Sequence, residues 1–317
     1  MSYFDPIIQV VFVALAAPFL LGLMIQVRSI LEGRQGPGVS QVWRDLRKNF
    51  RKNTITPDGT TVFFSWAPYV HFGTALLVSA ITPIVVSSLI GDPYVDLFAI
   101  VGILLLGTVS LVLAGLDTGT AFGGMGASRE MTILALVEPT ILMSVYAVSI
   151  PMHSSNLGVI VEGLTRHPFQ AVSPGNALAM VALVIVILAE TSRLPIDNPH
   201  THLELTMIHE AMILEYSGSR LALMEWAASI RLAVFLSLLA NLSLPFEIAS
   251  PGGSLLRSVV GLVAISLKVG LLGVAIASAE VFVAKLRLFR VPELLAGSFV
   301  ISVLAVAGSF MFSIGLK

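Results

Sequence analysis

The segment from Glu190 to Gly218, ETSRLPIDNPHTHLELTMIHEAMILEYSG, collects side chains that can bind and release a proton. It holds five of the 19 acidic residues and three of the six histidines of a 317-residue chain. Histidine titrates near neutral pH, and burial can raise the pKa of a carboxylate towards neutrality. This mixture is therefore suited to proton transfer.

Metal binding and a solvated surface helix are the alternatives for this segment. His200 and His202 could chelate a metal ion, but the stretch after His209 reads HEAMI and lacks the second histidine of a zincin motif. Two neighbouring histidines also fall short of the three or four ligands that zinc takes. We predict no metal site. A solvated helix stays open on this segment alone, because charge runs usually face water.

Further ionisable residues interrupt the apolar segments of the chain: Glu138, Glu190, Glu225, Arg231, Lys268 and Glu280. Each costs at least ~2.5–3.5 kcal/mol on insertion into a bilayer, so such groups usually pair inside a bundle or line an ion path. Together with the acidic segment they predict a hydrated proton route. Lys268 and Glu280 lie twelve residues apart, about 18 Å along a helix, and so need separate partners. Candidates are Glu138 and Glu225 for Lys268, and Arg193 and Glu204 for Glu280.

Composition predicts the elements that must position these groups. The chain is 56% hydrophobic and 12% charged, and its mean hydropathy is +0.92. Apolar runs of about 20 residues, each long enough to span the hydrocarbon core, recur throughout. We predict an all-α integral membrane protein, one domain over 1–317, with eight transmembrane helices. The expected spans are 6–28, 63–90, 95–115, 130–150, 174–192, 219–244, 255–281 and 294–315.

The chain contains no cysteine, which excludes disulfides and thiolate-bound zinc or Fe–S clusters. The first apolar run lacks a basic leader and a small-residue cleavage site, so we expect a retained span. Lysine and arginine concentrate in the connections 29–62, 116–129, 193–218 and 282–293, which are therefore expected in the cytoplasm, with both termini outside. We expect a multi-pass protein of the cell membrane.

Two of these connections are expected to carry amphipathic helices. The first contains a basic helix whose charged residues could rest on anionic lipid or dock a soluble partner: Arg34, Arg44, Arg47, Lys48 and Arg51. No nucleic-acid-binding signature accompanies them. In the third, Asn198 and Pro199 suit a helix start and Gly218 suits its end. A helix of roughly 18 residues would place Glu204 and Glu215 on one face and His202 and His209 on the other.

Several motifs resemble the membrane subunit of NADH-quinone oxidoreductase that forms the complex I subunit 1 family. AETSRLPIDNP, LEL and EYSG resemble the loop between its fifth and sixth spans. GLDTGTAFGGMGASREMTILALVEP, RQGPGVSQVWRD and the span carrying Lys268, Glu280 and AKLRL are closer to the hydrogenase-4 and formate hydrogenlyase branch of that family.

The resemblance implies a subunit without a redox centre of its own that joins membrane and peripheral arms. Expected partners are antiporter-like membrane subunits, an Fe–S protein, and hydrogenase-type large and small subunits that carry the Fe–S and [NiFe] centres. The implied channel and loop residues are Glu130, Glu138, Glu190, Arg193, Asp197, Glu204 and Glu215. With Glu225, Lys268 and Glu280 they make up the expected proton pathway, and His200, His202 and His209 are expected as a loop relay.

Departures from the quinone-reducing members in two loops argue against a quinone chamber. His200 and His202 stand where those members usually have acids, three extra residues separate Glu204 from Tyr216, and the first loop is shorter. The leading hypothesis is a non-catalytic, ion-translocating subunit of a group 4 hydrogenase or formate hydrogenlyase complex. A quinone-binding subunit of a complex I-type dehydrogenase and a purely structural membrane anchor are the alternatives.

Overall fold

The computed structural model describes residues 4–84, 96–166, 173–197, 207–245 and 255–315, and these ranges fold into helices without a β-strand. The elements are α1 (Phe4–Leu31), α2 (Gln41–Phe50), α3 (Val62–Ile81), α4 (Leu97–Asp117), α5 (Ala121–Ser149), η1 (Ile150–Met152), α6 (Leu157–Arg166), α8 (Pro174–Glu190), α9 (His209–Ile213), α10 (Gly218–Ser243), α11 (Leu255–Phe282), η2 (Leu288–Arg290) and α12 (Val291–Gly315). The predicted fold class, an all-α membrane protein, is confirmed.

Seven of the described helices are long and apolar enough to cross a membrane: α1, α3, α4, α5, α10, α11 and α12. The eighth expected span corresponds to α8, which is apolar but only 17 residues long. At 1.5 Å per residue it measures about 25 Å, less than the ~30 Å hydrocarbon core. The predicted count of eight full spans is therefore one too high. α8 packs against α5, α10 and α12, so neighbouring helices cover it.

The expected connection at 116–129 is wrong, because α5 begins at Ala121. Thr120 accepts a hydrogen bond from the Gly123 backbone N–H and caps the helix, while Gly119 turns the chain with φ of +62°. The loop between α4 and α5 shrinks to three residues. α5 also packs against α9 with its backbone close to the Ile208 carbonyl, since a Cβ on Gly126 would lie 2.9 Å from that oxygen.

The expected long helix ending at Gly218 is also wrong in its described part, because only α9 is helical between Met207 and Ser217. Side chains bind the backbone groups just before α9. Asp197 accepts from the Ile208 N–H at 3.2 Å, and Arg129 donates to the Met207 carbonyl at 2.9 Å. The Ile208 N–H and the Met207 carbonyl are therefore hydrogen-bonded to side chains and not to the backbone of a helix. His200, His202 and Glu204 lie outside the described residues.

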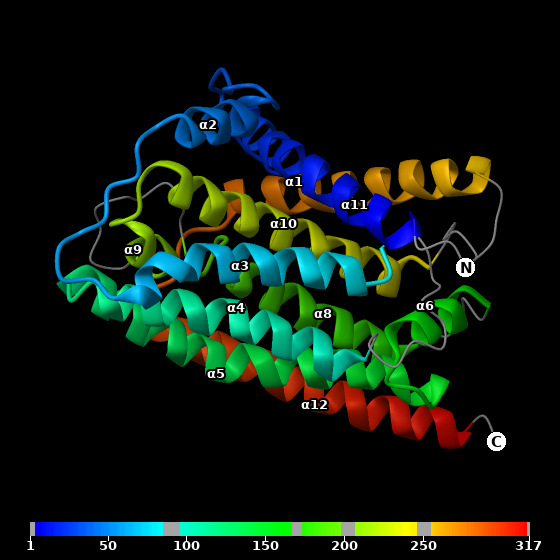
Figure 1. The fold of residues 1–317 in the computed structure, drawn as a ribbon. Coiled ribbons are helices and arrows are strands. Elements are labelled where there is room, and N and C mark those ends of the chain that lie inside the picture. The colour runs from blue at the N-terminus through cyan, green and yellow to red at the C-terminus, as the bar shows by residue number, and fades with distance from the viewer. Residues whose placement is uncertain (1–3, 85–95, 167–172, 198–206, 246–254, 316–317) are drawn as a thin grey trace.

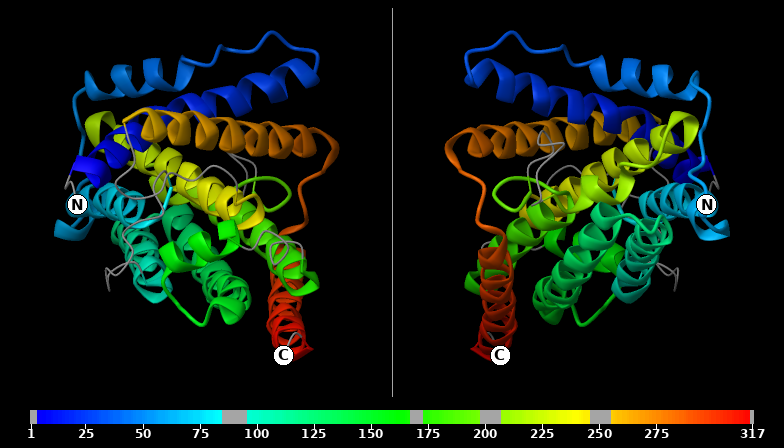
Figure 2. Two further views of the ribbon diagram at one scale, coloured as in Figure 1. Left: turned by 90° about the vertical axis from the view of Figure 1, so that its right-hand side faces the viewer. Right: turned by 90° about the vertical axis from the view of Figure 1, so that its left-hand side faces the viewer.

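The bundle is arranged in layers, with α1 and α11 side by side along one edge and α5 and α12 along the other (Figure 1). α10, α3, α4 and α8 lie between these two pairs, an arrangement that the side views repeat (Figure 2). α2 and α9 lie at one end, and the start of α1, the end of α12 and α6 lie at the opposite end (Figure 1). The start of α1 and the end of α12 therefore lie away from α2 and its basic residues.

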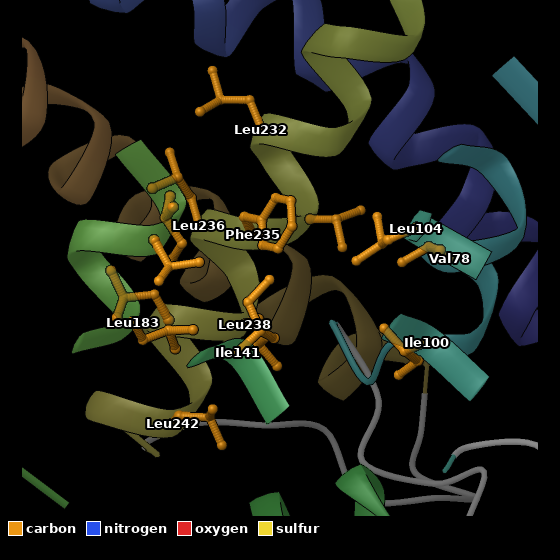
Figure 3. Packing of buried hydrophobic residues seen from close by; sticks show 14 of the residues in the cluster. Val78, Ile100, Leu104, Ile141, Leu183, Leu232, Phe235, Leu236, Leu238 and Leu242 are labelled. Carbon is orange, nitrogen blue, oxygen red and sulfur yellow. The ribbon is translucent and has the colours of Figure 1, made fainter. Parts of the chain in front are cut away.

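α10 is the central helix, because it is the most deeply buried of the seven spans. Its residues Phe235, Leu236 and Leu238 pack against Leu104 of α4 and Leu183 of α8 (Figure 3). The same helix carries Glu225 and Arg231. The charged groups of α10 are therefore held in the middle of the bundle and not at its lipid surface.

Candidate functional site

A cavity of about 420 Å³ lies among α1, α2, α3, α4, α5, α8, α9 and α10. We call it the charged cavity, since ionisable side chains from six of these helices and from the loop after α8 line it. The lining includes Asp45, His71, Glu130, Glu190, Arg193, His209, Glu210, Glu225 and Arg231. It begins at α2 and α9, the end of the bundle with the basic loops, and reaches into the span region.

The inner part of the charged cavity is organised by Arg231. Its guanidinium forms a buried ion pair with Glu190 and donates to the Thr108 hydroxyl at 2.8 Å. His71 lies nearby, with its Nδ1 3.1 Å from the Gly107 carbonyl oxygen. Gly107 allows α3 and α4 to approach closely here, because a Cβ there would lie 2.5 Å from the Thr74 hydroxyl and 3.4 Å from Arg231.

Two carboxylates of α5 extend this group. Glu130 lines the charged cavity, and Glu138 is half-buried about 12 Å further along the helix. Both interact electrostatically with Glu190 and with Arg231. Three carboxylates therefore share the field of one guanidinium, an arrangement in which a proton can move between acids without leaving an isolated buried charge.

The outer part of the cavity joins α2, α9 and α10. Asn49 on α2 donates to the Glu225 carboxylate at 3.2 Å. Burial, the charge of Glu225 and that of Asp197 raise the pKa of Glu210 to about 7. Burial and the charge of Arg231 lower the pKa of His209 to about 4, although Asp197 acts in the opposite direction. At neutral pH, Glu210 is therefore poised to exchange a proton while His209 is neutral.

A second group, the Glu280 ion cluster, adjoins the charged cavity through Arg193. Glu280 is buried and lies 3.5 Å from Arg193 and 3.8 Å from Arg28. Burial lowers the pKa of Arg193, and Glu280 opposes that shift. The expected contact between Glu280 and Arg193 is thus present. It ties α1 and α11 to the loop that follows α8.

Asp197 fixes the same loop from its other end. Its carboxylate accepts from Lys285 at 3.2 Å and from the Ile208 N–H. The Leu286 N–H donates to the Pro195 carbonyl at 2.8 Å, so the segment after α11 runs along the loop. The Arg-x-Pro-x-Asp element, Arg193 to Asp197, is therefore bound at both of its charged residues.

Two expected pathway residues lie apart from the charged cavity. Glu215 is exposed in the turn between α9 and α10. Lys268 donates to the Leu244 carbonyl at 2.9 Å, at the end of α10 that is distant from Glu225. Neither lines the charged cavity.

The predicted amphipathic helix is present as α2. Its basic residues and those just before it are exposed: Arg34, Arg44, Arg47, Lys48 and Arg51. Leu46 and Asn49 are buried on the opposite side. Trp43 and Phe50 meet Trp226 of α10 edge to face, with centroid separations of 5.6 and 6.2 Å. The apolar side of α2 thus packs on α10, and its basic side faces away from the bundle.

Sequence reasoning missed four residues of the site: Asp45, Asn49, His71 and Glu210. Arg231 stood out as a charge in a span, but only the fold joins it to Glu190. His71 carried a similar signal, a histidine inside an apolar segment. Asp45 and Asn49 are four residues apart and share a helix face, a spacing that could have indicated their common side. Among the described residues, no group of three or more His, Cys, Asp or Glu side chains is arranged to hold a metal ion.

Comparisons with known proteins agree with this architecture. The family model described as NADH dehydrogenase matches residues 5–310. Formate hydrogenlyase subunit 4 of Escherichia coli (strain K12) is 32% identical over 311 residues, covering 96% of this chain and 98% of its own. Hydrogenase-4 component C of the same organism is 32% identical over 243 residues, 75% of this chain and 74% of its own.

More distant similarities extend to complex I and to a solved structure. A subunit of the NADH-quinone oxidoreductase of Koribacter versatilis (strain Ellin345) is 29% identical over 203 residues, 60% of this chain and 46% of its own. A chain of the membrane-bound sulfane sulfur reductase, an archaeal respiratory membrane complex, superposes with a TM-score of 0.81 at 16% identity. It covers 97% of this chain and 99% of its own, so the two share a fold.

Proposed function

The chain belongs to the NADH dehydrogenase family, and from this premise we propose that it is the ion-translocating, cofactor-free membrane subunit of a group 4 hydrogenase or formate hydrogenlyase-type complex. Its similarity to formate hydrogenlyase subunit 4 extends over nearly all of both chains at 32% identity, whereas the quinone oxidoreductase subunits it resembles match 60–73% of this chain at 27–29% identity. This difference in coverage favours the hydrogenase branch over the quinone-reducing one.

The charged cavity carries the proposal. It offers a continuous series of ionisable groups from the basic end of the bundle to its centre, where such groups are costly unless they pair or conduct ions. A proton entering at Glu210 or Glu225 reaches Glu130 and Glu190 through the cavity and then Glu138 on α5. Arg231 compensates the negative charge that remains as a proton moves between Glu190 and the two α5 carboxylates.

The Glu280 ion cluster supplies the link to redox chemistry in this proposal. Arg193 and Asp197 lie on the loop after α8, and both pair with residues of α11 or the segment after it. A partner that shifts this loop therefore changes the charges beside the cavity. His200, His202, Glu204 and Glu215 remain proposed relays on the same side, and Lys268 remains a proposed member of the route at the far end of α10.

The exposed basic face of α2 is the proposed docking surface for the peripheral subunits. Arg34, Arg44, Arg47, Lys48 and Arg51 would steer and hold an acidic surface of an Fe–S or hydrogenase-type subunit. Those partners would carry the [NiFe] and Fe–S centres. Antiporter-like membrane subunits would receive the proton from Glu138.

The experiment that tests this function uses the purified complex in sealed vesicles. We expect Glu138→Gln and Glu190→Gln to retain donor-to-acceptor electron transfer and to lose most proton translocation, because glutamine keeps the shape but cannot release a proton. Glu162→Gln is the matched control, since Glu162 lies on α6 and pairs with the exposed Arg166. Full translocation by both the Glu138 and the Glu190 variant would favour a structural anchor instead.

A second measurement separates the hydrogenase branch from quinone reduction. Extracting quinone from the vesicles should leave electron transfer and translocation unchanged. Loss of turnover that returns on addition of a quinone would contradict the proposal and support a quinone-binding subunit.

A further inference from the structure

A second cavity, of about 280 Å³, opens on the membrane side of the bundle between α1 and α11. We call it the lateral groove. It is lined by Phe12, Val13, Ala16, Phe19, Leu20 and Leu23 of α1, Ala233 and Ser237 of α10, Ile265, Ser266, Val269 and Gly270 of α11, and by Val39 and Ile84. α1 and α11 lie side by side along one edge of the bundle (Figure 1), and both expose large apolar side chains, among them Leu15, Leu267 and Leu271.

The lining suits a hydrocarbon chain. Val13, Ala233 and Ile265 form a buried floor, and Phe19 and Ser266 form an exposed rim. The two serine hydroxyls are already engaged, because Ser237 donates to the Ala233 carbonyl and Ser266 to the Leu262 carbonyl. A polar headgroup would gain little inside such a groove, whereas an acyl chain would bury apolar surface on both sides.

The length of the groove suits a single acyl chain. From Phe12 to Leu23 the α1 wall rises about 16 Å, roughly half of a ~30 Å hydrocarbon core. At the end nearer α2 the wall is completed by Val39, which precedes that helix. Val39 lies directly on α1, since a Cβ on Gly22 would come 2.0 Å from its carbonyl oxygen. The groove therefore runs along α1 from the level of Ile84, just past the end of α3, to the loop that bears the basic residues.

The charges beside that end are predominantly positive. Residues 28–52 contain seven lysines and arginines and two acids, a net charge of +5. Arg44 lies against the loop next to Val39, because its guanidinium donates to the Pro37 carbonyl at 3.0 Å and remains exposed. Arg34 is also exposed and lies 3.6 Å from Glu32. Basic clusters immediately cytoplasmic of a span attract anionic lipid headgroups.

We propose that the lateral groove binds one acyl chain of an anionic phospholipid from the cytoplasmic leaflet, with its headgroup held beside Val39 by Arg44. The apolar walls select a chain and the adjoining +5 segment selects the charge of the headgroup. This site is separate from the charged cavity and does not depend on the proposed ion translocation.

The first test needs no variant. The intact complex is placed in vesicles of phosphatidylcholine and phosphatidylglycerol, with a photoreactive group on one acyl chain of the phosphatidylglycerol. We expect labelling to concentrate on α1 residues 12–23 and α11 residues 265–270. Uniform labelling of all lipid-facing spans would overturn the proposal, as would recovery of a quinone or of a partner-subunit segment in the groove.

The second test uses two separate variants. One fills the groove with a side chain, and the other removes the positive charge of Arg44. Gly270 has open space where a Cβ would stand, so Gly270→Leu should fit and displace the chain. Gly102→Leu is the matched control, because Gly102 on α4 also has open space and lies elsewhere. By native mass spectrometry we expect the tightly held phosphatidylglycerol to be lost only from the Gly270 variant.

Arg44→Gln should lower phosphatidylglycerol retention about fivefold, the effect of removing one basic residue near an anionic surface. Arg166→Gln should not change it, because Arg166 is exposed on α6, outside the basic segment. The site would be refuted if the Gly270 and Gly102 variants retained equal amounts of phosphatidylglycerol. It would also be refuted if the wild-type complex retained phosphatidylcholine and phosphatidylglycerol equally.

Discussion

Arg231 of α10 and Glu190 at the end of α8 form a buried ion pair, and Thr108 of α4 accepts a further hydrogen bond from the guanidinium. The two residues lie 41 positions apart in the sequence and on different helices. The pair fixes three helices to one another at the point where the charged cavity meets the span region. Its geometry therefore matters both for stability and for the acids of α5.

Removing Arg231 alone should destabilise the subunit strongly. Arg231→Met leaves Glu190 buried without its guanidinium, at a cost of about 3–5 kcal/mol. We expect a lower temperature of dissociation for the purified complex and partial recovery in the double variant Arg231→Met, Glu190→Gln. The exposed pair of Arg166 and Glu162 is the control, for which Arg166→Met should cost about 0–1 kcal/mol. Equal costs for the two arginines would contradict this prediction.

Glu210 should impose a pH dependence with a midpoint near neutrality. Its carboxyl, with a pKa of about 7, is protonated below that pH and ionised above it. We expect infrared difference spectra to show a carboxyl band that disappears as pH rises through about 7 and is absent from Glu210→Gln. Proton uptake by the complex should increase over the same range, because only the ionised form accepts a proton.

The control for Glu210 is Asp58→Asn, since Asp58 is exposed on the loop between α2 and α3. That variant should keep the band and the pH dependence. If the carboxyl band persists unchanged in Glu210→Gln, the group that titrates near pH 7 is not Glu210.

Asn49 should act as a positioning residue for Glu225. Asn49→Ala removes the 3.2 Å hydrogen bond and leaves a buried carboxylate oxygen without that donor, a cost of about 1–3 kcal/mol to its ionised form. Docking of peripheral subunits should continue, because the exposed basic residues of α2 are unchanged. We expect fewer protons translocated per electron in Asn49→Ala, and normal values in Asn53→Ala, whose residue is exposed beyond α2. Unchanged coupling in both variants would exclude the role.

Several spans could be predicted closely from the sequence. α1, α10 and α11 end within three residues of the expected boundaries, because their apolar runs are long. The start of α5 could not be predicted, since its first turns contain glycines and Arg129 and resemble a loop by composition. That part is helical because α9 packs against it closely at Gly126.

The charged residues of the site were predictable to a different extent. Glu138, Glu190 and Glu225 are conspicuous as acids in apolar spans. The partnership of Asn49 with Glu225 was not predictable, because 176 residues separate them and only the packing of α2 on α10 brings them together. The hydrogen bond from Lys268 to the Leu244 carbonyl was not predictable either, because it depends on where α10 ends.

The orientation is directly testable, because the chain has no cysteine of its own. Asp45 on α2 and Ser155 before α6 are both exposed and lie towards opposite ends of the bundle. A single cysteine in place of Asp45 should react with an impermeant reagent from the cytoplasm, and one in place of Ser155 from outside. The reverse pattern would invert the topology and move the docking surface to the other side of the membrane.

Lys268 offers a test of whether the route continues beyond the charged cavity. Its ammonium donates to the Leu244 carbonyl at the C-terminal end of α10, where the helix dipole favours a positive charge. Lys268→Met keeps the length and apolar bulk of the side chain but removes this charge. We expect the variant to assemble and transfer electrons from donor to acceptor, with proton translocation lost in vesicles. Lys268→Arg, which keeps a cation at the same helix end, should remain coupled. If the Lys268→Met complex assembles and remains fully coupled, the role of Lys268 is limited to capping α10. If only the Met variant fails to assemble, the cap is needed for folding.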